Sequence, residues 1–264
     1  MAVYVMTHKF IDLSLPKNYK LMLLGAYNKQ NVPAKYVTDS EGKNISSKNS
    51  SYCELTGLYN LWQNYNDKNI GLVHYRRFFT NNNYYSRFLM YLKIMILGKI
   101  NLSPIKVKDL DKYLENCDWI IPTKEIQAGK TLWDHYSKHH YEKDLIITEN
   151  IINNKYPEYR EAFNYVLHKQ NKMSPFNMFY TTKYQVDRYC KWLFSVLYDI
   201  ESATNISNYD RFQRRLYGFL AEELFNVWIY KHKELKIKYL SVYNTHLVNR
   251  GQILSRIANR GRIS

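Results

Sequence analysis

Four consecutive residues, His74-Tyr75-Arg76-Arg77, combine an imidazole with two guanidinium groups and follow directly on the apolar run at residues 70–73. Guanidinium groups are planar, permanently charged and able to donate two parallel hydrogen bonds, so they suit the oxygens of a diphosphate better than lysine does. Arginines also pair readily with surface carboxylates. The residues alone therefore leave two interpretations open, a diphosphate site and a solvated basic strand end.

Two histidines, His135 and His139, have the i, i+4 spacing of metal ligands on one helix face. Tyr136 stands where the zinc-protease motif requires a glutamate, and the sequence offers no evident third ligand. We therefore predict no metal site in the chain.

Apolar runs and periodicities predict the elements that must position these residues. Buried strands are predicted at residues 3–7, 70–73, 118–121 and 177–181. Helical periodicity marks residues 132–140, 144–153, 158–169, 185–201 and 211–231. Strands that alternate with helices predict an α/β fold with a mainly parallel central sheet flanked by helices. Ligands of such sheets gather beyond the carboxyl ends of the strands, which is where the basic cluster lies.

A capping-box pattern predicts one helix start. Ser51 and Glu54 have the required spacing, so Glu54 is expected to cap a helix that begins at Ser51 rather than to act in catalysis. Leu55, Leu58 and Trp62 then recur at helical spacing and give this helix one apolar face.

The 264 residues suffice for one large domain, and no internal repeat divides them. We assign residues 1–234 to one catalytic domain and residues 235–264 to a basic C-terminal tail without Asp or Glu, either packed on the domain or associated with a membrane. The formal net charge of +15 implies an anionic partner: a nucleic acid, a membrane surface or a phosphorylated substrate.

Three widely spaced cysteines and a start without a recognisable export signal indicate a reducing compartment. The most apolar stretch, residues 84–100, is interrupted by Arg87, Lys93 and Lys99, which disfavours a membrane-spanning helix. We expect a cytoplasmic protein, peripheral on the inner face of the cell membrane.

The segment at residues 44–79, NISSKNSSYCELTGLYNLWQNYNDKNIGLVHYRRFF, closely resembles the signature of a family of bacterial domains of unknown function associated with glycosyltransferases of capsular and exopolysaccharide synthesis. Further matches follow in order along the chain: HYSKHH (135–140), FNMF (176–179), YCKWLF (189–194) and YGFLAEELFNVW (217–228). The resemblance covers about residues 3–231.

The resemblance implies a GT-A-like fold and an inverting hexosyltransferase. UDP-linked galactose, with the furanose form as one option, is the implied donor, and a polysaccharide or lipid-linked oligosaccharide is the implied acceptor. In transferases of that fold, an Asp-x-Asp motif holds a divalent metal where this chain has His74, Tyr75 and Arg76. Cations in place of carboxylates imply that no metal is required, with Mg or Mn left open.

Roles for individual residues follow from the resemblance. It assigns donor contacts to the basic cluster, His74, Tyr75, Arg76 and Arg77, and to Asn44 and Ser46. It assigns acceptor contacts to His135, His139, Asn177 and Met178.

An inverting transfer also needs a base for the acceptor hydroxyl, usually a carboxylate. Glu222 is the first candidate by its order along the chain, and Asp39 is the second. The alternative is that Glu222 and Glu223 form a solvated helix face, since acidic helix residues are mostly exposed.

Two functions of other classes compete with this prediction. The charge and the 26 tyrosines would suit a nucleic-acid-binding groove with stacking platforms. No ordered nucleic-acid-binding motif occurs, however, so we expect no nucleic acid partner. A non-catalytic scaffold of a polysaccharide assembly complex is the other alternative.

Overall fold

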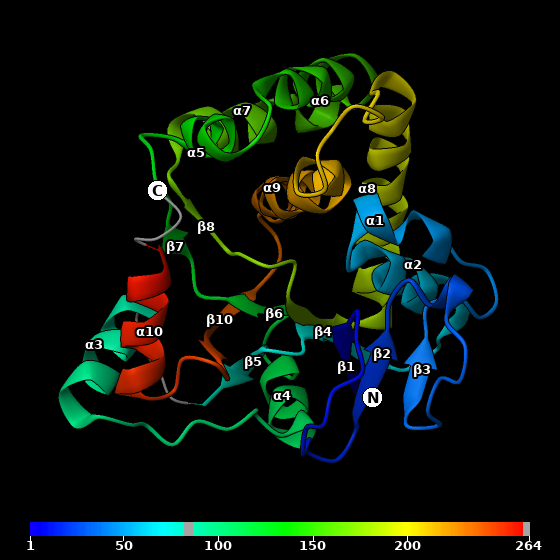
Figure 1. Ribbon diagram of the computed structural model, residues 1–264. Coiled ribbons are helices and arrows are strands. Elements are labelled where there is room, and N and C mark those ends of the chain that lie inside the picture. The colour runs from blue at the N-terminus through cyan, green and yellow to red at the C-terminus, as the bar shows by residue number, and fades with distance from the viewer. Residues whose placement is uncertain (82–86, 261–264) are drawn as a thin grey trace.

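A mixed sheet of eight strands forms the centre of the protein in the computed structural model, which describes residues 1–81 and 87–260 (Figure 1). Its strands lie in the order β3-β2-β1-β4-β5-β10-β6-β9. They span β1 (Ala2–Thr7), β2 (Tyr19–Leu23), β3 (Tyr36–Thr38), β4 (Asn69–His74), β5 (Arg77–Thr80), β6 (Trp119–Pro122), β9 (Phe179–Thr182) and β10 (Ile237–Asn244). A small separate sheet pairs β7 (Glu125–Ile126) with β8 (Lys172–Met173).

The helices that surround the sheet begin and end at the following residues: α1 (Asn49–Tyr52), α2 (Leu55–Asn64), α3 (Arg87–Leu97), α4 (Val107–Leu114), α5 (Leu132–His139), α6 (Glu142–Lys155), α7 (Arg160–Lys169), α8 (Lys183–Ala203), α9 (Leu216–Lys231) and α10 (Arg250–Arg260). Within the described residues, no helix has the length and apolarity needed to cross a bilayer.

The predicted α/β class is confirmed, whereas the prediction of a mainly parallel sheet needs correction. Strands β3, β2, β1 and β4 are parallel neighbours, and so are β6 and β10. Strands β5 and β9, by contrast, run antiparallel to their partners. Only Tyr75 and Arg76 separate β4 from β5, a connection far too short for the crossover that parallel strands require.

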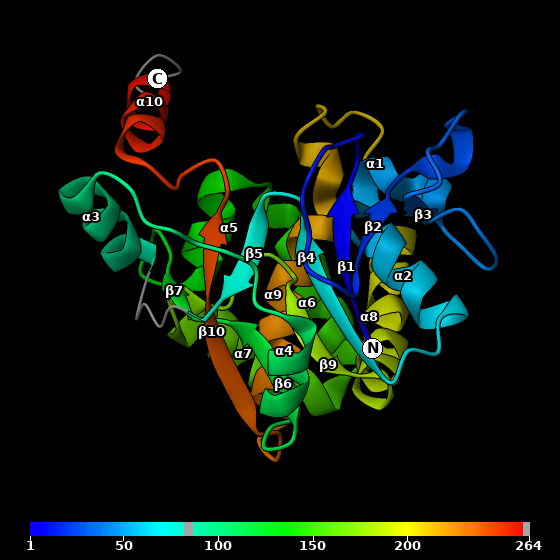
Figure 2. The same ribbon diagram turned by 90° about the horizontal axis from the view of Figure 1, so that it is seen from below.

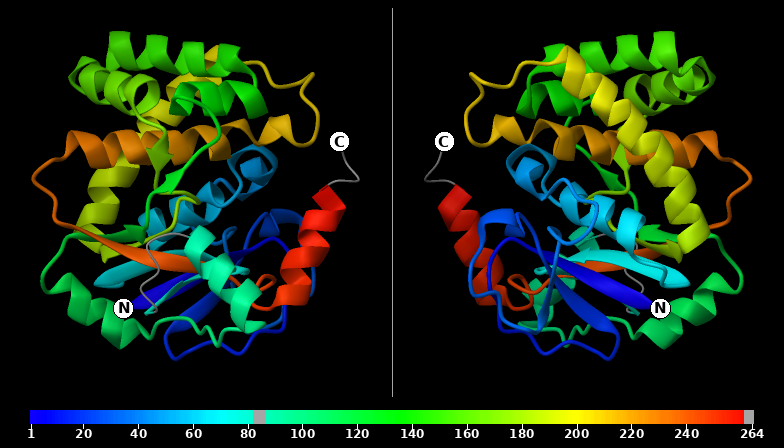
Figure 3. Two further views of the ribbon diagram at one scale, coloured as in Figure 1. Left: turned by 90° about the vertical axis from the view of Figure 1, so that its left-hand side faces the viewer. Right: turned by 90° about the vertical axis from the view of Figure 1, so that its right-hand side faces the viewer.

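Alternate side chains of β1 enter two different cores, as the period of a strand requires. Tyr4 and Met6 pack into the core formed with α2, α8 and α9, whereas Val3 and Val5 pack into the core shared with α3, α4 and α10. Figure 3 shows the sheet between these layers, with the bundle of α5 to α9 above it. Residues on both faces of β1 are therefore apolar, which is why the sequence shows a continuous apolar run.

The predicted capping box is wrong. The helix breaks at Cys53, whose φ of 51° ends α1, and α2 begins only at Leu55. The Ser51 hydroxyl donates to the carbonyl of Lys48 instead of capping. The break frees the Glu54 carboxylate, which accepts a hydrogen bond at 2.7 Å from the side-chain amide of Asn177.

The segment expected as a C-terminal tail begins with a strand of the central sheet, because β10 pairs with both β5 and β6. Helix α10 follows and lies beside α3 (Figure 1). Residues 84–86 of the apolar stretch and Arg262 of the tail lie outside the described residues.

Candidate functional site

A cavity of about 810 Å³ opens at the carboxyl ends of β1 and β4. Thr7 and His74, the last residues of these two strands, line it. The strands are parallel neighbours, and Figure 2 shows them side by side in the sheet. The cavity thus lies where ligands bind in sheets of this kind. Its other walls come from the junction of α1 and α2, from residues 211–215 and from α9.

Arginine side chains dominate the charge of the cavity. Its lining includes Arg76, Arg77, Arg211, Arg214 and Arg215. The guanidinium of Arg77 lies 4.2 Å from the ring centroid of Phe176, and that of Arg215 lies 5.1 Å from the ring centroid of Phe219. The Arg215 Nε also donates to Cys53 Sγ at 3.2 Å. Aromatic faces orient these planar cations, so the cavity presents ordered donors to an anionic ligand.

Two carboxylates, Glu54 and Glu222, line the same cavity. Burial raises the pKa of both side chains. For Glu222, the neighbouring Glu54 raises the pKa further. The hydrogen bond from the Phe176 backbone N–H lowers this pKa, and so do the side chains of His74 and Arg77. A carboxylate whose pKa lies above its usual range is a better proton acceptor. Glu223 is buried and Glu222 is half-buried, so the two residues do not form a solvated helix face.

The backbone of Phe176 connects His74 with Glu222. Its N–H donates to Glu222 Oε2 at 2.9 Å, and its carbonyl oxygen lies 2.7 Å from His74 Nε2. Phe176 has a φ of 79°, a conformation that non-glycine residues rarely adopt, and such strain is often found at functional sites. Both polar groups of this one residue thus hold side chains of the cavity in place.

His74 is neutral at physiological pH. Burial is the largest cause that lowers its pKa, to about 4, and Arg77 and Arg215 lower it further. A carbonyl oxygen can only accept, so Nε2 carries the proton and donates to Phe176. The positive charge of the predicted basic cluster therefore comes from Arg76 and Arg77 alone.

The structure does not bring Asp39 and Ser46 into this cavity. The fully buried Asp39 carboxylate accepts hydrogen bonds from the backbone N–H groups of Gly25 (2.8 Å) and Ala26 (3.0 Å). It also accepts from the hydroxyls of Ser46 and Thr56, each at 2.5 Å. This network ties the loop after β2 to α2, so the position of Asp39 does not support the predicted catalytic role.

Other predicted contacts are distributed around the fold. The Asn44 side chain donates to two carbonyl groups of its own exposed loop. His135 and His139 lie on α5 and contact carbonyl oxygens of residues 128 and 135 rather than the cavity. Asn177 is buried against Glu54, and Met178 is buried in the core below α3 and α4. Tyr75 lines the cavity.

Asp39→Ala is expected to lower the free energy of unfolding by about 3 kcal/mol or more, because two backbone N–H groups and two hydroxyls lose a charged acceptor. Urea unfolding measures the loss. Asp12→Ala is the matched control, because the Asp12 side chain is fully exposed, and its stability should stay within about 0.5 kcal/mol of the wild type. A stable but inactive Asp39→Ala variant would return Asp39 to the list of catalytic candidates.

Sequence reasoning missed the arginines at 211, 214 and 215. The segment RFQRR immediately precedes α9, which carries Glu222, and its pair of adjacent arginines matches the pair at 76 and 77. This second pair of adjacent arginines could have indicated a further part of the anion-binding site. In the fold, Asp210 accepts from the backbone N–H groups of Phe212 and Gln213 and so orders this segment at the start of α9.

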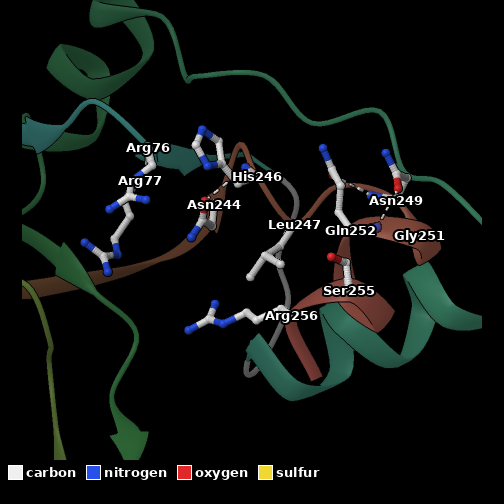
Figure 4. A pocket seen from close by; sticks show the side chains of 10 residues that line it. All are labelled: Arg76, Arg77, Asn244, His246, Leu247, Asn249, Gly251, Gln252, Ser255 and Arg256. Carbon is white, nitrogen blue, oxygen red and sulfur yellow. Dashed lines mark hydrogen bonds between the residues drawn. The ribbon is translucent and has the colours of Figure 1, made fainter. Parts of the chain in front are cut away.

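A second cavity, of about 890 Å³, shares Arg76 and Arg77 with the first. Figure 4 shows its other lining residues on β10, on the turn that follows and on α10. Across residues 1–81 and 87–260, no group of three or more His, Cys, Asp or Glu side chains is arranged to hold a metal ion.

Comparison with known proteins adds two similarities. The model of a family described as a domain of unknown function (DUF4422) matches residues 2–233. The apo structure of WbbM, a bifunctional glycosyltransferase, is similar with a TM-score of 0.79 and 28% sequence identity. The match covers 92% of this chain and 45% of that chain, so this chain spans less than half the length of the WbbM structure. No match occurs among the curated proteins.

Proposed function

The chain belongs to the DUF4422 family of domains of unknown function, and we propose that it is a glycosyltransferase that moves a sugar from a nucleotide-sugar donor to a hydroxyl group of an acceptor glycan. One observation carries the proposal: a single cavity at the carboxyl ends of parallel strands holds clustered arginines together with the carboxylates of the buried Glu54 and the half-buried Glu222. The similarity to the bifunctional glycosyltransferase WbbM over nearly the whole chain supports it.

In this proposal the donor diphosphate lies against Arg76 and Arg77 of the cavity, which Arg215 also lines. Charge builds up on the diphosphate as the bond to the sugar breaks, and guanidinium groups held in place before the reaction stabilise that charge. We propose a GT-A-like donor arrangement and a UDP-linked hexose. Galactose, in its pyranose or furanose form, is the first sugar to test.

Glu222 acts as the base in an inverting transfer. The Phe176 N–H binds Oε2, which fixes the carboxylate and directs Oε1 to receive the proton of the acceptor hydroxyl. The acceptor proposed is a polysaccharide or a lipid-linked oligosaccharide of capsule or exopolysaccharide synthesis. Nucleic acid is not a partner in this proposal.

Turnover is expected to continue in the presence of a chelator. In this proposal the arginines that line the cavity take the place of a metal ion, because guanidinium groups can offset the charge of the diphosphate themselves. The measurement compares donor turnover in buffer, in EDTA, and in EDTA followed by excess Mn or Mg. Loss in EDTA and recovery with either ion would show that a divalent metal belongs to the site.

Thermal stabilisation by a panel of nucleotide sugars tests the function itself, because a ligand that binds the folded state raises its apparent stability. A UDP-sugar should stabilise the protein, and the purified protein should slowly hydrolyse that donor. Binding without hydrolysis or transfer would favour the scaffold alternative. Stabilisation by random oligonucleotides, but by no nucleotide sugar, would favour the nucleic-acid alternative.

A further inference from the structure

Helices α3 and α10 form a pair beside the central sheet. The backbone N–H of Arg250 donates to the carbonyl of Gly98 at 2.8 Å, and its guanidinium donates to the carbonyl of Ile96 at 3.0 Å. Lys99 and Asn249 pair as an antiparallel bridge. All views show the two helices side by side (Figures 1, 2 and 3). Their relative position is therefore fixed by backbone as well as side-chain contacts.

The outer side of this pair is apolar. Phe88 (72% exposed), Ile96 (68%) and Leu97 (61%) on α3 and Ile257 (63%) on α10 face solvent. The inner faces of the same helices pack into the core through the buried side chains of Met90, Ile94 and Ile253. The exposed apolar side chains therefore have no part in this packing. Exposed apolar side chains gathered on two neighbouring helices are typical of an interaction site. We call the outer side of this pair the α3–α10 surface.

The charge of α3 and α10 indicates what binds to the α3–α10 surface. Helices α3 and α10 together carry five lysines and arginines and no Asp or Glu. Exposed apolar side chains combined with basic residues are typical of helices that lie in the interface of an anionic bilayer.

The second cavity adjoins α10. Its wall on α10 includes Ser255 and Arg256, and its opposite wall includes Arg76 and Arg77 of the donor cavity. Figure 4 shows the Arg256 side chain extending from α10 toward the side where the two arginines lie. The lining that the structure describes contains basic and polar side chains without Asp or Glu. A phosphate-bearing headgroup at the bilayer surface suits this cavity.

We infer that the α3–α10 surface docks on an anionic lipid bilayer and that the second cavity receives phosphate-bearing lipid headgroups, beside the donor site. This inference deepens the proposed function and rests on it for the nature of the acceptor. A glycan carried on such a lipid would pass Arg76 and Arg77, which both cavities share, to reach Glu222. The physical docking can be tested without turnover.

Sedimentation with vesicles provides the test. Vesicles of phosphatidylcholine alone are compared with vesicles in which about one third of the lipid is phosphatidylglycerol. The wild-type protein should bind the anionic vesicles at low salt and bind them less as the salt concentration rises. Little protein should bind to the neutral vesicles. The double variant Ile96→Ser/Ile257→Ser should bind the anionic vesicles at least about tenfold more weakly than the wild type. Arg256→Gln should bind about fivefold more weakly.

Two matched controls change equally exposed residues elsewhere. Ile126→Ser removes an apolar side chain that is 70% exposed on β7, and Lys191→Gln removes one charge from an exposed position on α8. Both should bind like the wild type, and thermal unfolding should show that all variants fold. Equal binding of the wild type to neutral and anionic vesicles, or unchanged binding of the double variant or of Arg256→Gln, overturns the inference.

Donor binding is measured in the same preparations without vesicles. Absence of UDP-sugar binding in the wild type contradicts the proposed function and leaves the docking result intact. Normal donor binding with no vesicle binding contradicts the docking surface alone.

Discussion

Glu222→Gln is expected to fold and to bind the donor, yet to turn over about 10²–10⁴ times more slowly than the wild type. The amide preserves the shape of the side chain and can still accept from the Phe176 N–H, but it cannot take a proton from the acceptor. Single-turnover rates at saturating donor measure the effect, and titration with the UDP-sugar shows whether binding is retained.

Glu223→Gln is the matched control for this variant. Burial and the adjacent Glu222 raise the pKa of Glu223 to about 8, so its side chain is mostly neutral at pH 7 and an amide resembles it. This variant should keep a rate near that of the wild type. A normal rate in Glu222→Gln together with a large loss in Glu54→Gln would transfer the base to Glu54, the other carboxylate of the cavity.

The dependence of the rate on pH provides a second measurement of the same role. A base works only when deprotonated, and the pKa of Glu222 is raised, so the rate should fall as the pH drops through that raised value. His74, whose pKa lies near 4, is neutral throughout this range and does not contribute. The acid limb should therefore be absent from the residual activity of Glu222→Gln.

Arg76→Ala and Arg77→Ala are each expected to weaken donor binding by about 10- to 150-fold, the effect of losing a hydrogen bond to a charged group. Arg76→Lys should recover only part of the affinity, because lysine keeps the charge but not the paired donors. Calorimetric titrations with a UDP-sugar, UDP and uridine measure the effect. The loss should appear with the first two ligands and not with uridine, which lacks the diphosphate.

Arg160→Ala is the control, because this exposed arginine on α7 contacts only a backbone carbonyl among the hydrogen bonds described for it. Arg77 also lowers the pKa of Glu222, so the Arg77→Ala variant should move the acid limb of the rate to higher pH. Unchanged affinity for the UDP-sugar in both alanine variants would show that the diphosphate lies elsewhere.

The strands at 3–7, 70–73 and 118–121 and the helices with one apolar face could be predicted from the sequence. These features depend on local periodicity, which is visible in a short window. The sequence also placed Arg76 and Arg77 beyond the end of a buried strand, because an apolar run that stops at charged residues must emerge from the sheet there. Glu222 was chosen by its order along the chain, and it lines the cavity.

Which distant residues meet depends on long-range packing. Glu54 reaches Asn177 across 123 positions, and Arg215 reaches Cys53 across 162, so no local pattern could link them. The break at Cys53, on which the role of Glu54 depends, requires a backbone conformation that propensity disfavours and tertiary packing holds.

Tertiary structure likewise decided the place of β10. Its apolar residues suit a strand, but insertion between β5 and β6 depends on pairing with segments more than 100 residues earlier. The role of Asp39 also depends on the fold. A carboxylate could act in catalysis, but the fold surrounds this one with four hydrogen-bond donors, which gives it a structural role. Residue type thus sets the chemistry that is available, and long-range packing determines which groups share one cavity.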